Sequence, residues 1–434
     1  MRSRVFSVLA IAALATACAR IAAAGGVSGG HADAVAPALL GLAVLLLAAK
    51  VGGDLCDRIG QPAVLGELLV GVVLGNLDSL GVHQLAYLKH DPAIALLAEL
   101  GVILLLFEVG LESSVGEMLS VGPSALVVAI LGVVAPMALG FGVSEWFHPG
   151  SVYLHLFVGA TLCATSVGIT ARVLQDLGRS QTPEARVILG AAVIDDVLGL
   201  IVLATVTGLI AAAGGGAGVS ATMVGGIVGK AVAFVVGAVA IGYFLSPSVL
   251  RMAARLRARG MLLTTGLFIC FLLAYLAQQV GLAPIVGAFA AGLVIEDGHA
   301  EPFYARGSDK LHELLHPLLT FLVPIFFVRM GLLVDVRQFF DPAVIGFAVA
   351  LTAAALIGKQ VCGLGVLSPG LNRVAVGLGM IPRGEVGLIF ANIGAAMGLN
   401  GQPIVGPQEF SAVVFVVMAT TLMTPPLLRW SLAK

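Results

Sequence analysis

The sequence predicts an all-α polytopic membrane protein with about 13 transmembrane helices, and three observations indicate this fold class. Hydrophobic residues make up 59% of the 434 residues and charged residues only 11%, against roughly 25% charged in a typical soluble domain. Apolar runs of about 20 residues, enough to cross a bilayer as a helix, follow one another with short polar connections. Basic residues gather on alternate connections, as in proteins that keep positive charge on the cytoplasmic side.

The first residues have the pattern of a signal peptide. Arg2 and Arg4 supply the basic region, residues 5–18 the apolar core and residues 22–24 a small-residue cleavage site. We therefore expect residues 1–24 to be a cleaved signal peptide, and the alternative is a retained extra helix.

The remaining chain divides into predicted spans without a soluble domain. Their expected limits are 37–53, 62–79, 92–110, 121–143, 153–174, 186–211, 221–245, 261–279, 283–297, 314–334, 342–366, 374–398 and 409–428. With the mature N-terminus outside, the arginines of the connections 172–186 and 251–259 lie inside, whereas the outer loops hold only Lys89 and Arg337. We expect a multi-pass protein of the cell inner (plasma) membrane with a cytoplasmic C-terminus.

An odd number of spans also fits an inverted repeat. Six spans over residues 37–211, a linking span over 221–245 and six more over 261–428 would place the two halves in opposite orientations. Many transporters are built in this way, with the ion site near mid-membrane where the halves meet.

Two adjacent aspartates, Asp195 and Asp196, lie in the middle of a long apolar run. One ionisable group at mid-membrane costs about 2.5–3.5 kcal/mol on insertion scales, so two in sequence indicate a function. Close carboxylates resist joint ionisation, which lets protons and cations compete for them. We interpret the pair as a cation site; the alternative is a satisfied buried pair that only fixes helix packing.

Two stretches at corresponding positions of the halves have the composition of interrupted membrane helices. The first, 159–170, is rich in Gly and hydroxyls and contains Thr165 and Ser166; the second, 377–387, contains Arg383 and Glu385. Unwound segments free carbonyl groups to coordinate a cation. Thr165 and Ser166 either join the cation site or bond back to their own helix. Arg383 and Glu385 are expected to neutralise each other and to be structural or gating residues.

Other charges also lie inside predicted spans. Lys359 is too deep to reach either surface comfortably, so it needs a counter-charge, for which Asp195 or Asp196 is the natural candidate. Snorkelling near a helix end is the alternative. Glu67 could line the cavity entrance or lie protonated at a helix interface. Arg329 needs a partner that the sequence does not identify.

The sequence offers little for other chemistry. It contains no phosphate-binding glycine loop, no histidines at metal-ligand spacing and no nucleophile elbow. Adjacent aspartates also disfavour an intramembrane aspartyl protease, which would place them on different helices. A net charge of −1 argues against nucleic acid as a partner. We therefore expect a transporter rather than an enzyme, with no cofactor.

Four segments together resemble the monovalent cation:proton antiporter-2 family of sodium/proton exchangers. They are residues 62–71, 99–112, 191–196 and 381–387. The resemblance covers essentially the whole mature chain and is strongest to the bacterial electrogenic branch, which carries an Asp-Asp pair and a lysine in the span before the second broken helix.

The resemblance implies a homodimer with a panel of interface helices, a six-helix core with two crossed discontinuous helices, and elevator-type alternating access. By motif match, Asp196 is the implied carboxylate that carries the cation and the proton, so that sodium binds at Asp196 and Asp195. Asp195 is the implied partner of Lys359, which would release its proton when sodium enters. Exchange of two protons for one sodium is also implied.

One departure concerns regulation. Relatives that export potassium under glutathione control usually carry a cytosolic nucleotide-binding domain after the last span, and this chain ends at Lys434. We expect no nucleotide-binding domain in this chain. Sodium/proton antiport is the favoured function; the alternatives are potassium/proton antiport on the same scaffold and, in a different class, a passive cation channel.

Overall fold

The structure is a computed structural model, which describes residues 32–80, 83–112, 122–166, 170–171, 173–174, 179, 182–214, 221–256, 258–295, 301–304, 309–399 and 402–432. The predicted signal peptide, residues 1–24, lies outside these ranges.

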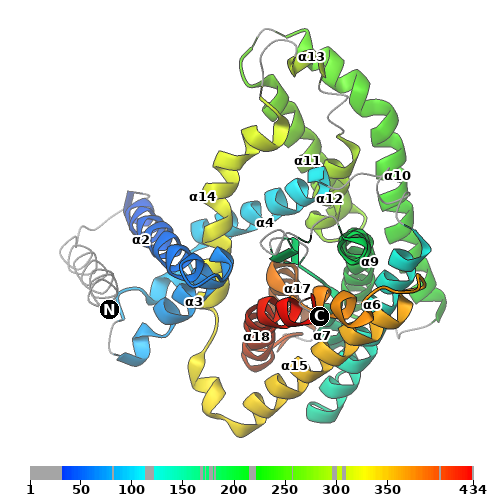
Figure 1. Ribbon diagram of the computed structural model, residues 1–434. Coiled ribbons are helices and arrows are strands. Elements are labelled where there is room, and N and C mark those ends of the chain that lie inside the picture. The colour runs from blue at the N-terminus through cyan, green and yellow to red at the C-terminus, as the bar shows by residue number, and fades with distance from the viewer. Residues whose placement is uncertain are drawn as a thin grey trace. The chain divides into compact units, whose positions relative to one another are not determined.

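Almost all of the regular structure is α-helical (Figure 1). The α-helices are α2 (Ala32–Asp57), α3 (Ala63–Gly75), α4 (Pro92–Glu112), α6 (Pro123–Phe147), α7 (Val152–Cys163), α9 (Pro183–Gly214), α10 (Ala221–Ala254), α11 (Met261–Gln279), α12 (Pro284–Val294), α13 (Glu301–Tyr304), α14 (Leu311–Leu332), α15 (Pro342–Cys362), α16 (Arg373–Gly379), α17 (Gly384–Ala396) and α18 (Pro407–Leu432). Short 3-10 helices are η1 (Leu77–Leu80), η2 (Ala86–Lys89), η4 (Val336–Phe340) and η5 (Gly363–Gly365), and β1 (Gly398–Leu399) pairs antiparallel with β2 (Gln402–Pro403).

Nine helices in the described part of the chain are long and apolar enough to cross a membrane, judged by length and composition. They are α2, α4, α6, α9, α10, α11, α14, α15 and α18. The other predicted spans coincide with shorter apolar helices, namely α3, α7, α12 and the pair α16–α17. The prediction of a helical, multi-pass membrane protein is therefore confirmed.

The chain folds as two compact units, of which the first comprises Met1–Val102 and Thr320–Phe340. Within it, α2 and α3 form a close helical hairpin. The chain reverses at Gly60, whose φ of 73° lies in the left-handed region that favours glycine. A Cβ atom on Gly66 would collide with the carbonyl oxygen of Gly52, so the two backbones touch. Small residues at such crossings are how membrane helices approach closely.

The far end of α3 packs against the part of α14 that belongs to the same unit. Gly71 meets the backbone of Gly331 with no space for a side chain on either residue. Just beyond α3, the Asn76 side chain donates a hydrogen bond to the Val334 carbonyl at 2.8 Å and accepts one from the Val336 N–H at 2.9 Å. These contacts fix the end of α3 to the end of α14.

The second unit comprises Ile103–Leu319 and Asp341–Lys434, and it contains the same local arrangement in α11, α12 and the C-terminal half of α4. Gly281, between α11 and α12, has a φ of 84°. A Cβ on Gly287 would collide with the Leu273 carbonyl oxygen, and Gly292 meets Gly110 of α4 backbone to backbone. A hairpin of two helices thus packs through paired glycines on a third helix in each unit.

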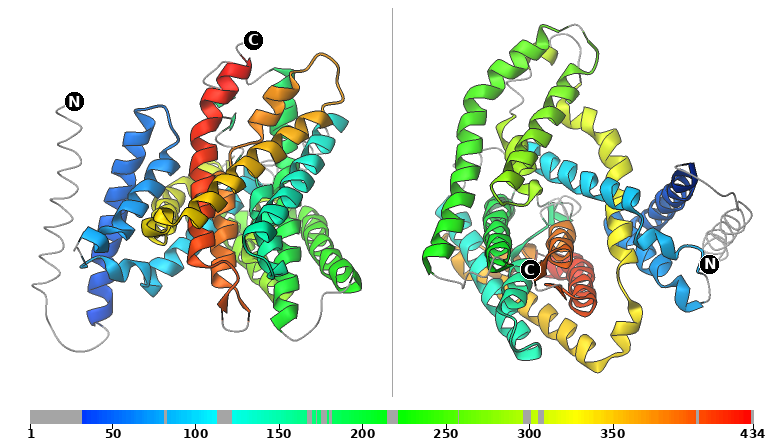
Figure 2. Two further views of the ribbon diagram at one scale, coloured as in Figure 1. Left: turned by 90° about the horizontal axis from the view of Figure 1, so that it is seen from below. Right: turned by 180° about the vertical axis from the view of Figure 1, so that it is seen from behind.

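In the rest of the second unit, α6 packs closely against both α7 and α15. Gly140 of α6 lies against Gly159 of α7, and Gly358 of α15 lies against Pro136 of α6. Helices α9, α16, α17 and α18 complete this core. The long helix α10 runs along the outer side of the unit beside α11, as Figure 2 shows.

Candidate cation site

Lys359 and Asp195 form a buried ion pair in the second unit. The Lys359 Nζ, near the end of α15, lies 3.2 Å from both carboxylate oxygens of Asp195 on α9. Both side chains are 0% exposed. Breaking such a buried pair by removing one partner typically costs about 3–5 kcal/mol, because a charge is left uncompensated. The structure thus places the Lys359 ammonium group against Asp195, one of the two counter-charges expected from the sequence, with no part of either side chain exposed.

Asp196 occupies the next position of α9 and is half-buried, whereas Asp195 is fully buried. Neighbouring helical residues point about 100° apart. Helix α9 thus directs one carboxylate at the lysine and holds a second, partly accessible carboxylate at a different angle.

Two interrupted helices meet beside this pair. The first interruption is the extended segment 164–166 after α7, and the second is the segment 380–383 between α16 and α17. Pro382 lies in the second segment and has no N–H to continue a helix. The sequence predicted helix interruptions in both stretches, and the structure contains them.

Three hydrogen bonds join the two interrupted helices at these breaks. The Ser166 N–H donates to the Pro382 carbonyl (2.7 Å) and the Thr165 hydroxyl to the Met380 carbonyl (3.3 Å), both within the second break. The Thr170 hydroxyl donates to the carbonyl of Gly379, the last residue of α16 (2.6 Å). Thr165 also hydrogen-bonds to the Asp195 carboxylate. The Thr165 hydroxyl therefore does not simply bond back to its own helix, and it links the breaks to the ion pair.

Arg383, in the second break, also forms hydrogen bonds with the backbone at the first break. Its guanidinium is fully buried and donates to the carbonyl oxygens of Ala164 at 2.7 Å and Cys163 at 3.4 Å, and to that of Ala355 at 3.3 Å. The last carbonyls of a helix carry partial negative charge, so a cation at the end of α7 is stabilising. The described hydrogen bonds of Arg383 thus run to backbone carbonyls, and a structural or gating role for Arg383 stays a prediction. The side chain of Glu385 lies outside the described structure.

Small residues surround the lysine. A Cβ atom on Gly132 of α6 would lie 3.4 Å from the Lys359 Nζ and 3.8 Å from the Asp195 Oδ1. The Cys163 thiol donates to the Val133 carbonyl at 3.3 Å, and Cys362 bonds back to its own helix. A larger side chain at Gly132 would press directly on the ion pair.

The model of the transmembrane sodium/hydrogen exchanger family matches residues 40–434. The chain belongs to the sodium/hydrogen exchanger family. This finding confirms the expectation of a monovalent cation:proton antiporter family.

The exchanger is similar to several characterised relatives along most of its length. It is 38% identical to the high-affinity Na⁺/H⁺ antiporter NhaS3 of Synechocystis sp., over 91% of this chain and 90% of the relative. It is 36% identical to the Na⁺/H⁺-K⁺ antiporter GerN of Bacillus cereus, over 90% of this chain and 95% of the relative. Its fold resembles the sodium proton antiporter MjNhaP1 of Methanocaldococcus jannaschii, with a TM-score of 0.63 and 14% identity over 90% of this chain and 95% of that chain.

The other charged membrane residues singled out by the sequence belong to the first unit, not to the unit that holds the ion pair. Glu67 on α3 is buried and interacts electrostatically with Lys50 of α2. Arg329 on α14 interacts electrostatically with Glu99 of α4, a partner that the sequence did not identify. That Glu67 lines the cavity entrance stays a prediction.

Sequence reasoning missed two residues of the exchanger's site. Thr170 lies in the predicted stretch 159–170 but was not singled out, although its hydroxyl makes the shortest of the three hydrogen bonds between the two interrupted helices. Gly132 carried no signal, because one glycine among many in an apolar run does not reveal which side chain it faces. Among the described residues, no three His, Cys, Asp or Glu side chains gather as metal ligands. Cation ligands here would be carboxylate, hydroxyl and carbonyl oxygens.

Proposed function

We propose that this exchanger is an electrogenic sodium/proton antiporter of the cell inner membrane. The observation that carries the proposal is the buried Lys359–Asp195 pair with Asp196 beside it on α9. A site with two carboxylates and one lysine can hold either protons or a cation, and its net charge depends on which is present. The family membership and the Na⁺/H⁺ antiporters among its relatives support the same activity.

The proton and sodium forms of the site follow from the ion pair. In the proton form, Lys359 is an ammonium group bound to Asp195, and Asp196 is protonated. In the sodium form, the cation is held by the carboxylates of Asp196 and Asp195, with Thr165 and Ser166 as candidate oxygen ligands. Sodium competes with the ammonium group for Asp195, so Lys359 releases its proton.

The charge balance predicts electrogenic exchange. With both aspartates ionised and Lys359 neutral, the site carries two negative charges. Two protons bring it to zero, whereas one sodium ion leaves one negative charge. Exchange of two protons for one sodium therefore moves one net charge per cycle. A membrane potential drives such a cycle with about 2.3 kcal/mol per 100 mV.

An inverted repeat is the arrangement that best accounts for the paired glycines. In the first half, α3 carries Gly66 and Gly71 with five-residue spacing; in the second, α12 carries Gly287 and Gly292 with the same spacing. The first glycine of each helix packs against the helix that precedes it in the chain. The second glycine packs against the third span of the other half, so that α3 contacts α14 and α12 contacts α4. We infer six-span repeats over 37–211 and 261–428 around a linking span, 221–245.

The further arrangement is also proposed from the sequence and the resemblance. The mature N-terminus would lie outside and the C-terminus in the cytoplasm, as the distribution of arginines favours. Two copies would form a homodimer, and the core with the crossed breaks would carry the ion by an elevator movement. The many contacts between the two breaks support movement of this core as one body.

The test is made on purified protein in liposomes with a trapped pH dye and an imposed membrane potential. Sodium and potassium are added to separate samples. We expect the addition of sodium to cause proton movement across the membrane, at a rate that changes with the imposed potential. Sodium flux without coupled proton movement would instead indicate a passive cation channel and would refute the proposal.

Potassium/proton exchange is the second candidate function. It is favoured by the relative GerN, whose name includes potassium, and by the K⁺/H⁺ antiporter subunit KhtU of Bacillus subtilis, which is 26% identical to this chain. The same liposomes distinguish the ions, because a proton response to potassium at equal concentration would assign the second function.

A further inference from the structure

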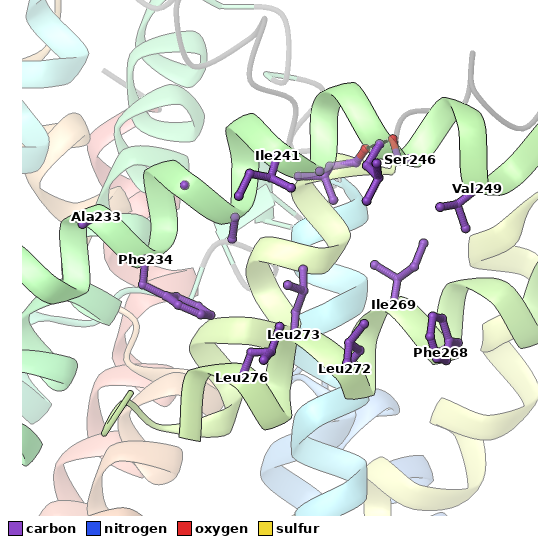
Figure 3. A pocket seen from close by; sticks show the side chains of 15 residues that line it. Ala233, Phe234, Ile241, Ser246, Val249, Phe268, Ile269, Leu272, Leu273 and Leu276 are labelled. Atoms are coloured by element: carbon purple, nitrogen blue, oxygen red, sulfur yellow. Dashed lines mark hydrogen bonds between the residues drawn. The ribbon is translucent and has the colours of Figure 1, made fainter. Parts of the chain in front are cut away.

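The linking helix α10 and its neighbour α11 enclose an apolar groove in the second unit (Figure 3). Its volume is about 380 Å³. Aliphatic and aromatic side chains from the two helices line it, among them Phe234, Ile241 and Val249 of α10 and Phe268, Leu272 and Leu276 of α11. The groove therefore suits a hydrocarbon ligand.

The groove is long and accessible. Its lining extends along α10 from Ala233 to Val249, about 24 Å of helix axis. The hydrocarbon depth of one bilayer leaflet is about 15 Å, half of the full core. Ile241 and Phe268 remain 65% and 59% exposed, so the described chain leaves these side chains uncovered. One extended acyl chain can lie along such a groove.

The end of the groove at Val249 leads into a wholly basic segment. Residues 221–295 contain no Asp or Glu, and the end of α10 and its connection to α11 carry exposed Arg251, Arg255 and Arg259. Within the described residues, none of these three arginines forms an ion pair. The first turn of α11 adds unpaired backbone N–H groups, because its N-cap residue, Gly260, has no capping side chain. An anion is the complementary partner of this surface.

We propose that the groove binds an anionic phospholipid, with an acyl chain against α10 and α11 and the phosphate at Arg251, Arg255 and Arg259. A neutral lipid could use the groove, but it would leave the three arginines without a matching charge. Basic residues near a membrane surface contribute about 1 kcal/mol each toward anionic lipid, which corresponds to about fivefold in affinity per arginine. The bound lipid would attach the linking helix to its neighbour and stabilise the second unit.

Two glycines of α10 provide a matched pair of variants. Gly237 lines the groove and Gly229 does not, and a Cβ atom on either residue would meet nothing within 4 Å. Gly237→Phe should fill the groove with a ring, whereas Gly229→Phe adds the same ring to the same helix outside it. Arg251→Gln with Arg255→Gln removes charge while leaving the groove open.

The measurement is lipid retention by native mass spectrometry of the full-length protein, together with the thermal shift on adding lipid. Dioleoyl-phosphatidylglycerol is compared with dioleoyl-phosphatidylcholine and with glycerol phosphate alone. We expect the natural protein to retain and be stabilised by phosphatidylglycerol. Gly237→Phe should lose at least about tenfold in retention while Gly229→Phe keeps it, and the double Arg variant should lose most of the preference over phosphatidylcholine.

Four results would overturn the proposal. Equal lipid retention by Gly237→Phe and Gly229→Phe would show that the groove is not the site. An unchanged preference for phosphatidylglycerol in the double Arg variant would remove the headgroup contact. Loss of dimer in Gly237→Phe, seen by cross-linking in lipid-free detergent, would assign the groove to a second copy of the chain. Stabilisation by glycerol phosphate alone would indicate a simple anion site.

Discussion

Replacing Lys359 with Ala should change the number of charges moved per cycle. In the proposed site, Lys359 carries one of two protons, and its ammonium group lies 3.2 Å from both oxygens of Asp195. Without it, Asp195 is a buried carboxyl group with no lysine partner, for which the neutral form is favoured. Only Asp196 would then exchange its proton for sodium, and the cycle would become electroneutral.

The magnitude follows from the charge balance. At zero pH gradient and a potential of −100 mV, one net charge per cycle supplies about 2.3 kcal/mol. This energy balances a sodium gradient of roughly 50-fold, since about 1.4 kcal/mol corresponds to a factor of ten. The natural protein should therefore hold sodium about 50-fold lower on the negative side. Lys359→Ala should hold no gradient under the same potential.

The assay clamps the potential of proteoliposomes and varies the sodium gradient until net proton movement stops. Lys230→Ala is the matched control, because Lys230 is an exposed lysine on α10 in the same unit. It should keep the roughly 50-fold balance point. The reasoning about Lys359 is refuted if the Lys359→Ala variant keeps that balance point.

Folding has to be separated from transport in this test. Loss of Lys359 leaves one member of a buried pair, with a cost of about 3–5 kcal/mol. The double variant Asp195→Asn with Lys359→Met removes both charges and should recover most of that stability, as a thermal unfolding assay would show. If the double variant is as unstable as Lys359→Ala, then packing rather than charge explains the loss.

Three further predictions concern the carboxylate, pH and the helix crossings. Asp196→Asn should abolish exchange, with loss of the sodium-driven proton signal in liposomes while size-exclusion profiles stay unchanged; activity like that of the natural protein would contradict its role. Exchange should rise between pH 6 and 9, because protons compete with sodium for carboxylates, and a dye assay with a flat profile would argue against competition. Gly287→Ala should lower the free energy of unfolding by more than about 3 kcal/mol through overpacking against Leu273. Gly229→Ala, in open space on α10, should stabilise by about 0.5–1 kcal/mol; similar thermal melting of the two variants would contradict the packing argument.

Most helices could be predicted from the sequence because each is a long apolar run. The predicted spans 92–110 and 261–279 coincide closely with α4 and α11, whose lengths are set by the membrane itself. The predicted break at 377–387 was visible because Pro382 and its neighbouring glycines oppose a continuous helix. The local sequence therefore locates these two spans and this interruption.

Contacts between distant segments could be predicted only where charge demanded them. A buried lysine requires an anionic partner, and the two membrane-embedded aspartates were the natural candidates. The pairing of Lys359 with one of them could therefore be predicted. The partners of Arg383 could not be predicted, because they are backbone carbonyls, two of them about 220 residues away in the sequence, and a carbonyl group is present in every residue. The glycine crossings were hidden for the same reason: a glycine does not indicate which backbone approaches it.

The hydrogen bonds from Arg383 to the carbonyl oxygens of Cys163 and Ala164 have a consequence for sequence variation. Every residue type supplies the same carbonyl oxygen, so these contacts do not restrict which side chains stand at those two positions; only the space around them does. The arginine itself has no such freedom, because lysine cannot divide its single ammonium group among three carbonyls in the same planar fork. Among descendants of this chain, we expect drift at positions 163 and 164 beside an arginine at 383 that does not change.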